Sequence, residues 1–274
     1  MAIITKITTQ QKNKDRFNIF MDYGKGEEYA FSVDSDVLIR FHLRKGLEID
    51  DLSIIEIQYQ DDIRKAYNLA VNYLARRMRS EKEIRDYLVK KEVEEPAINE
   101  VLHKLAAQRY INDEEYAFSY VRTQINTTDK GPDLVRMELK ERGISESIIK
   151  QSLAQYSNDE QIEKAIKITE KLFKKSTRES GRIVKQKAEQ LLVRRGYPYD
   201  IIQLALNEAD TDKEQDEELD AIRYQGEKVH RKYSKYSGLD YSLKMKQALF
   251  RKGFSMELIE KYLEEIENHD GYSS

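Results

Sequence analysis

The sequence predicts a mainly α-helical protein, built as four tandem three-helix repeats that form an elongated curved array behind a small N-terminal α+β unit. Two observations predict this fold class. A helix-ending motif recurs four times, at offsets of 51, 53 and 57 residues, and apolar residues keep spacings of three and four from Ile63 onward. The first sixty residues instead alternate apolar and polar residues, as strands do.

The N-terminal unit is expected to contain strands over 3–9, 17–21 and 29–33, where the alternation places every second residue on one face. The segment 22–28 holds two glycines and predicts a hairpin connection. Lys25 stands between these glycines, but the rest of a phosphate-binding loop is missing, so a plain turn is the better interpretation.

After the third strand the pattern changes. Asp34 or Ser35 can cap a short helix over 36–43 that stops near Gly46. The run 53–59 then predicts a further strand, and 60–62 is the expected junction with the repeats. About sixty residues make only a marginal core, so this unit is expected to pack on the helices that follow.

The first repeat shows the pattern of all four. One apolar stripe from Ile63 to Met78 predicts the first helix. Ser80 and Glu83 fit a capping box, which ends the first helix and starts the second. The third helix runs through 97–105, and Pro96 is tolerated in its first turn.

The repeats share a register at the end of the second helix, which reads LVKKEV, LKERGI, LVRRGY and LFRKGF. Glycine occupies the left-handed C-cap position in the last three, and Glu92 replaces it in the first, so we expect that turn to close in another way. The predicted boundaries are 1–60 for the α+β unit and 63–110, 111–156, 157–210 and 211–270 for the repeats.

The net charge of −3 conceals segregated charges. The segments 63–91, 171–196 and 223–252 each hold nine Lys and Arg, against three, two and two acidic residues. The segment 206–220 holds eight acidic residues and one lysine, and we interpret its acidic stretch from Glu208 to Glu218 as a solvated linker into the fourth repeat. Three basic blocks on one repeating architecture favour a polyanionic or acidic partner over plain solvated helix faces.

Nothing in the sequence indicates catalysis. The absence of cysteine excludes disulfides and thiolate sites, and the four histidines stand far apart, outside any metal-ligand motif. Ser145 resembles a nucleophile elbow only in part and is better interpreted as a helix cap. No apolar run approaches the ~20 residues of a membrane span. We therefore expect a cytoplasmic protein that is not an enzyme and has no cofactor, metal or membrane contact.

Eighteen tyrosines accompany the basic blocks, without any tryptophan. Tyr67, Tyr87, Tyr110, Tyr116 and Tyr120 stand at helical spacings, which favours core or half-buried packing. Tyr233 and Tyr236 lie among Arg231, Lys232 and Lys235, and such a mixture could stack on bases while the cations hold phosphates.

The segments 76–88 (RRMRSEKEIRDYL) and 110–121 (YINDEEYAFSYV), with 130–132 (KGP) and 139–144 (LKERGI), resemble the signature of the RecX regulatory proteins. The resemblance runs from about residue 63 to the C-terminus and is strongest over 66–156. The N-terminal extension and the fourth repeat resemble the longer members from Gram-positive bacteria.

This resemblance implies a protein that binds RecA, lodges in the groove of the RecA–DNA filament, and restrains strand exchange and the associated ATPase, most simply as a monomer. Basic residues on the repeats would then contact filament and DNA. The candidate contact residues are Arg76, Arg79, Lys82, Arg85, Lys90, Lys91, Lys174, Lys175, Arg178, Arg182, Lys185, Arg231, Lys232 and Lys235.

Two other functions fit the same sequence. The chain could bind nucleic acid alone, with no recombinase involved, or it could be a helical scaffold for another protein. The sequence leaves open whether filaments are inhibited or stabilised, and what the N-terminal unit contacts.

Overall fold

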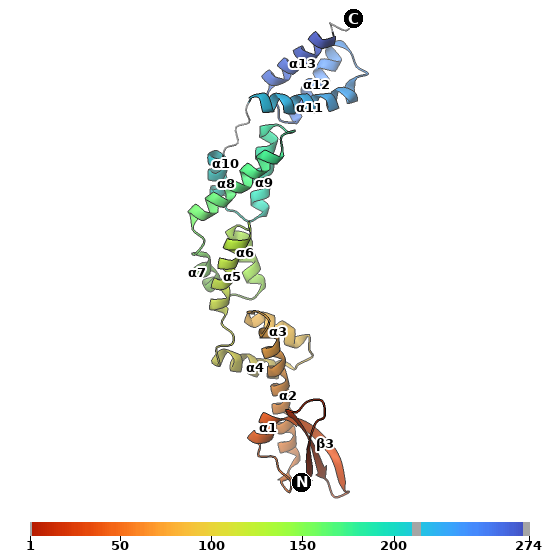
Figure 1. The fold of residues 1–274 in the computed structure, drawn as a ribbon, viewed down its shortest axis with the longest axis vertical. Coiled ribbons are helices and arrows are strands. Elements are labelled where there is room, and N and C mark those ends of the chain that lie inside the picture. The colour runs from red at the N-terminus through yellow and green to blue at the C-terminus, as the bar shows by residue number, and fades with distance from the viewer. Residues whose placement is uncertain (1, 210–214, 271–274) are drawn as a thin grey trace. The chain divides into compact units, whose positions relative to one another are not determined.

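A computed structural model describes residues 2–209 and 215–270 of the chain (Figure 1). Four strands and thirteen helices lie in these residues, so the protein is mainly helical with a small strand-containing unit at its N-terminus, as the sequence predicts. The chain divides into two compact units, one made of 1–117 and 140–148 and the other of 118–139 and 149–274.

The N-terminal sheet contains the three predicted strands and a short fourth one. Strands β1 (Ala2–Thr9), β2 (Arg16–Asp22), β3 (Glu27–Asp34) and β4 (Glu48–Ile49) pair antiparallel in the order β3-β2-β1-β4. The period of two places Ile4, Ile19, Met21 and Val33 on one face, where they are buried. That face carries the core of the unit.

The hairpin between β2 and β3 is a plain turn, as expected. The Asp22 carboxylate accepts hydrogen bonds from the N–H groups of Gly24 (2.7 Å) and Gly26 (2.9 Å). These two bonds, that of Gly26 first, hold the pKa of Asp22 below its ordinary value. Both glycines have positive φ, at 92° and 105°, which explains their presence.

The predicted strand over 53–59 is wrong. Helix α1 (Ser35–Arg40) begins after Asp34 as expected, but a single helix α2 (Asp51–Leu74) then runs through 53–59 and across the expected junction at 60–62. Ile54 and Ile57 pack on the sheet core, whereas Ile55 between them is 62% exposed. A run of β-branched residues resembles a strand here, although the side chains follow the helical period.

The helices form four consecutive groups of three. The first group is α2 with α3 (Glu81–Val89) and α4 (Glu95–Ala107). The others are α5 (Asp113–Thr127), α6 (Pro132–Glu141) and α7 (Glu146–Leu153); α8 (Asn158–Lys175), α9 (Gly181–Arg194) and α10 (Tyr199–Glu208); and α11 (Gln215–Tyr233), α12 (Gly238–Arg251) and α13 (Met256–Asp270).

Most of the predicted helix caps are confirmed. Ser80 and Glu83 make the capping box, and Asn112 accepts the N–H groups of Glu114 and Glu115 at the start of α5. The acidic linker needs a correction, because Glu208 is the last residue of α10, and Asp216, Glu217 and Glu218 form the first turn of α11, where negative charge suits the helix dipole. Asp210, Asp212 and Glu214, also assigned to that linker, lie outside the described residues.

The second helices of successive repeats meet at contacts that we call joints. In the first joint the Ser80 hydroxyl donates to the carbonyl of Arg142 (2.7 Å), and the N–H of Glu81 donates to the Asp113 carboxylate (2.8 Å). Each joint therefore brings the start of one second helix against the end of the next, and satisfies end groups that a helix leaves without partners.

The other two joints repeat this arrangement. The Ser180 hydroxyl donates to the carbonyl of Lys252 (2.6 Å), and the N–H of Gly181 donates to the Glu218 carboxylate (3.1 Å to Oε2). In the joint between them, the N–H of Gly131 donates to the carbonyl of Arg195 (2.7 Å). Helix α6 begins there with Pro132, which has no N–H that would need an acceptor.

The cap glycines are needed for space as well as for conformation. Gly143, Gly196 and Gly253 have φ of 82°, 80° and 89°. A Cβ atom on each would lie 2.3–2.7 Å from a residue of the preceding repeat, namely Cβ of Lys82, the backbone N of Leu134 and Oγ of Ser180. The first cap closes in the same left-handed way, with Glu92 at φ 59°, so the expected alternative closure is wrong. Among the described residues no repeat precedes this cap, so the Glu92 side chain meets no joint.

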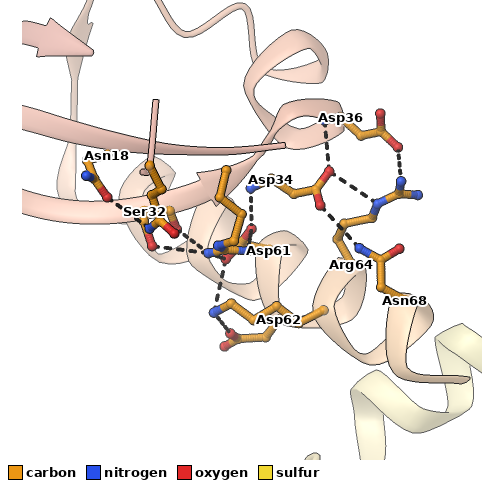
Figure 2. A network of polar contacts seen from close by, with 11 residues as sticks. Asn18, Ser32, Asp34, Asp36, Asp61, Asp62, Arg64 and Asn68 are labelled. Atoms are coloured by element: carbon orange, nitrogen blue, oxygen red, sulfur yellow. Dashed lines mark hydrogen bonds and ion pairs between the residues drawn. The ribbon is translucent and has the colours of Figure 1, made fainter. Parts of the chain in front are cut away.

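The N-terminal unit is held on α2 by a buried polar network (Figure 2). Asp61 is 1% exposed and accepts two bonds from the Arg16 guanidinium, at 2.8 and 3.2 Å, and one from the N–H of Asp34 at 2.7 Å. Arg64 approaches Asp34 at 3.3 Å. The same helix thus starts the first repeat and carries the charge that fixes the sheet.

Candidate nucleic-acid interface

The fourteen predicted contact residues all lie among the described residues, and twelve of them are exposed. Arg79 and Arg85 are half-buried, and within the described parts of the chain they are the two of the fourteen that pair with an acidic side chain. Most of the predicted set is therefore available to an external anion.

Arg79 and Arg85 are engaged within the first repeat. The Arg79 guanidinium lies 4.0 Å from the centroid of the Tyr73 ring and 3.6 Å from Glu83. Arg85 pairs with Glu81 at 3.9 Å and with Glu95 at closer range. Arg79 thus links α2 to α3, and Arg85 links α3 to α4. These contacts leave little of either guanidinium free for a partner.

An aromatic column lies beside them. The rings of Tyr73 and Tyr87 stack with centroids 4.1 Å apart and an interplanar angle of 6°. Arg79 covers the outer face of Tyr73, and the Lys91 ammonium lies 5.8 Å from the centroid of Tyr87. Arg79 is thus largely buried against the column, whereas Lys91 is exposed just beyond α3, beside exposed Lys90.

Lys82 has a structural role in the first joint. Its ammonium donates to the carbonyl of Glu141 at 2.9 Å, at the C-terminal end of α6. A cation is favoured at the negative end of a helix dipole. Arg76, after the end of α2, is exposed and has no such partner among the described residues.

The third repeat presents its cations at the end of α8 and on α9. Lys174 and Lys175 complete the last turn of α8, and both are exposed. Lys175 lines a groove of 230 Å³ together with Lys171 and Arg195, which the sequence reasoning did not single out. Arg182 and Lys185 stand three residues apart on α9 and so share one side of it.

Arg178 is brought to the fourth repeat, 46 residues away in sequence. Its guanidinium lies 4.7 Å from the centroid of the Tyr224 ring, and the Lys228 ammonium lies 4.1 Å from the same ring. The hydrogen bond and charge of Lys228, helped by Arg178, hold the pKa of Tyr224 below its ordinary value. Sequence reasoning missed Tyr224 and Lys228, although their spacing of four on a helix was a signal.

The aromatic and cationic mixture of the fourth repeat is brought together. Tyr236 has the Lys235 ammonium 5.5 Å from its centroid and the Lys244 ammonium 4.6 Å away. Tyr233 is a further ring, 6.2 Å from Tyr236. Lys232 and Arg231 are exposed on the preceding turn. An exposed ring flanked by ammonium groups can stack on a base and hold a phosphate.

Two other kinds of site find no support in the part of the chain that the structure describes. It contains no group of three or more His, Asp or Glu side chains that could hold a metal ion. None of its helices is both long and apolar enough to pass through a membrane. The exposed cations and the tyrosine rings beside them are therefore the groups of these repeats that we consider for binding a partner.

Family models match almost all of these elements. "Regulatory protein RecX N-terminal domain" matches residues 2–50, "RecX, first three-helix domain" matches 66–105, and "RecX, second three-helix domain" matches 112–153. "RecX, third three-helix domain" matches twice, at 159–206 and 216–263.

The chain is also similar to curated proteins along nearly its full length. It is 48% identical to "Regulatory protein RecX" of Bacillus velezensis and 46% identical to that of Bacillus subtilis, over 97% of this chain and 100% of each relative.

Two solved structures share the fold. "Crystal structure of regulatory protein RecX" is 38% identical, with a TM-score of 0.66 over 76% of this chain and 100% of that one. "Crystal structure of RecX from Lactobacillus salivarius" is 39% identical, with a TM-score of 0.53 over 56% and 99%. With four matching domain models and relatives of this identity, the chain belongs to the RecX family of regulatory proteins.

Proposed function

We propose that this chain is a cytoplasmic, monomeric, non-enzymatic regulator that binds the RecA recombinase and its filament on DNA and inhibits strand exchange and the coupled ATP hydrolysis. One observation carries the proposal. Twelve of the fourteen candidate cations have no acidic partner among the described residues, and all twelve are exposed. The names of the relatives support a regulatory role.

The distribution of charge favours a specific polyanionic partner over general stickiness. The formal net charge is −3, so the chain as a whole is not drawn to nucleic acid. The exposed cations lie in three blocks, and each cation that meets a phosphate releases a condensed counterion from DNA. A filament that displays DNA and protein together fits such a surface.

The activity is tested by a strand-exchange assay with RecA. We expect inhibition when this chain is present at amounts well below those of RecA, because a regulator that lodges in a filament needs to act only at intervals along it. No inhibition at any ratio contradicts the proposal. Tight, salt-dependent binding to naked DNA without any effect on RecA would instead favour a stand-alone nucleic-acid-binding protein.

The interface is tested by a charge-reversal triple that avoids the engaged arginines, namely Arg76→Glu, Lys90→Glu and Lys91→Glu. The matched control reverses three exposed lysines of the N-terminal unit, Lys12→Glu, Lys14→Glu and Lys45→Glu. We expect the first triple to weaken filament binding and to lower the salt slope by roughly 0.9 for each DNA phosphate that is no longer neutralised. Equal effects of the two triples would mean that the interface lies elsewhere.

A further inference from the structure

The second helix of the fourth repeat begins as the other second helices do, but it has no joint. Ser237 stands before α12, where Ser80 and Ser180 stand before α3 and α9. In those two the serine hydroxyl donates to a carbonyl of the next repeat. Within the described residues, neither the Ser237 side chain nor the N–H of Gly238 has a hydrogen-bond partner. Half of a joint is therefore open.

The open half is apolar and hollow. Leu239 is 91% exposed, and Leu243, one turn further along α12, is 57% exposed. Ser237, Leu239 and Tyr236 line a groove of 660 Å³. The seam of the closed joint at Ser180 leaves a groove of 210 Å³. The two leucines lie one turn apart, so they give this surface an exposed apolar character.

The closed joints show what this surface receives. At each one the occupant is the end of a helix, with a left-handed glycine that lets the backbones approach and a carbonyl that accepts a hydrogen bond. In two of the joints a different helix of the next repeat adds a carboxylate, Asp113 of α5 or Glu218 of α11, which accepts the first N–H of the second helix. The position that is Lys82 or Arg182 in these joints is Leu239 in the open half, so its occupant is more apolar.

A second copy of this chain does not fit. Its unoccupied helix end is the first cap, where the Cβ of Glu92 would stand where the closed joints need glycine. Gly238 has a φ of 58°, whereas Glu81 and Gly181 have no such positive value, so the first turn of α12 must rotate to close. Glycine allows both conformations at low cost.

We propose that the surface formed by Ser237, Leu239 and Leu243 docks a partner protein through a glycine-capped helix end. Resting on the proposed function, this partner is the RecA subunit of the filament, and the surface supplies a protein contact distinct from the basic contacts to DNA. Apolar contacts are screened little by salt, unlike exposed charge pairs. The two kinds of contact therefore respond differently to ionic strength.

The test compares Leu239→Glu with Leu52→Glu, which places the same charge on a leucine that is 80% exposed at the start of α2. Binding is measured to RecA filaments on single-stranded DNA and to the same DNA alone, each at low and high salt, after circular dichroism has shown both variants folded. We expect Leu239→Glu to lose about tenfold in filament affinity at both salt concentrations. Leu52→Glu should match the wild type, and DNA binding should be unchanged in both variants.

Full filament binding by Leu239→Glu would overturn the inference, and so would an equal loss of binding to naked DNA. A wild-type dimer that this substitution makes monomeric would show that the surface takes a second copy, and would overturn it too. If the wild type itself fails to bind filaments, the proposed function fails and takes this inference with it.

Discussion

Two kinds of connection hold this molecule together, and they differ in chemistry. The N-terminal sheet is fixed to α2 by a buried ion network centred on Asp61, which is 1% exposed (Figure 2). The joints between repeats consist of a few hydrogen bonds from helix ends and a glycine at close approach. Breaking the ion network costs much free energy, because it leaves a buried charge without a partner. The joints depend instead on the close fit of helix ends at a glycine.

The difference indicates where the chain keeps one geometry and where it can adjust. Removing one partner from a buried ion pair leaves the other charge buried without a partner or water, which is strongly destabilising. The N-terminal unit is therefore expected to keep one position on α2. A joint can open with the helix-end groups transferring to water. We therefore expect the N-terminal unit and the first repeat to respond to mutation as one body, and the repeats to respond joint by joint.

The largest effect is expected from Asp61→Ala. The Arg16 guanidinium would lose both of its bonds to the carboxylate in a place where its side chain is 15% exposed. We expect a loss of about 3–5 kcal/mol in the free energy of unfolding, measured by urea titration with circular dichroism.

Asp62→Ala is its matched control. The Asp62 side chain is 64% exposed and pairs with Lys65, so its loss should cost less than about 0.5 kcal/mol. If the two adjacent alanine variants are equally stable, the network does not hold the sheet.

Gly196→Ala tests a joint. A Cβ there would lie 2.3 Å from the backbone N of Leu134, at a φ of 80°. We expect a cost of about 2–4 kcal/mol from strain and overpacking together. Gly46→Ala separates the two terms, because Gly46 has a φ of 84° and nothing within 4 Å of the added atom. Similar costs for both would mean that the joint imposes no steric demand.

Ser180→Ala should have a smaller effect, about 1–2 kcal/mol, because the hydroxyl accepts from the N–H of Ile183 and donates to the carbonyl of Lys252. Ser237→Ala makes the same change at the open half, where no cap bond exists, and should cost less than about 0.5 kcal/mol. Thermal unfolding of the pair measures the contribution of a closed joint. Equal shifts in the midpoint would contradict it.

The smallest effect concerns pH. Burial would raise the pKa of Glu83, but the N–H of Ser80 and the Arg77 guanidinium outweigh it, and the pKa lies below the ordinary 4.5. Such a group stabilises the fold above its unfolded pKa, and this contribution is lost as the pH falls through the folded pKa. We expect Glu83→Gln to cost about 0.5–1 kcal/mol at neutral pH and progressively less below about pH 4.5.

The pKa of Asp113, at the same joint, is shifted in the opposite direction to that of Glu83. Burial, with the charges of Glu81 and Glu83, raises its pKa above 3.8, although the N–H of Glu81 opposes the shift. Its protonated form suits the fold, so stability is lost as the pH rises through the folded pKa. Asp113→Asn, which keeps the acceptor, should therefore be no less stable than the wild type at pH 7. A destabilised Asp113→Asn at pH 7 would contradict this assignment.

Features with a local cause could be predicted from the sequence. The strands follow a period of two, the Ser80 capping box lies within four residues, and the three cap glycines indicate left-handed turns. The run 53–59 is the exception, because Ser-Ile-Ile-Glu-Ile favours a strand locally, while the sheet and Asp50 as N-cap impose a helix. Tertiary packing overrides propensity there.

In the candidate site, too, local features could be predicted from the sequence, and contacts between distant residues could not. Charge counts found the basic blocks, but could not tell that Arg79 lies on Tyr73 or that Lys82 donates to a carbonyl 59 residues away. The joints could not be predicted for the same reason, since each links residues 62–72 positions apart. The glycines mark one half of each joint, and its other half appears only when the helices are placed.

The central claim is that this chain binds RecA filaments through the exposed cations of its repeats. Electron microscopy of RecA–DNA filaments, prepared with and without saturating amounts of this chain, tests it most directly. We expect added density of three-helix repeats in the filament groove, with Lys90 and Lys91 directed toward the DNA. Filaments that look the same in both preparations would contradict it.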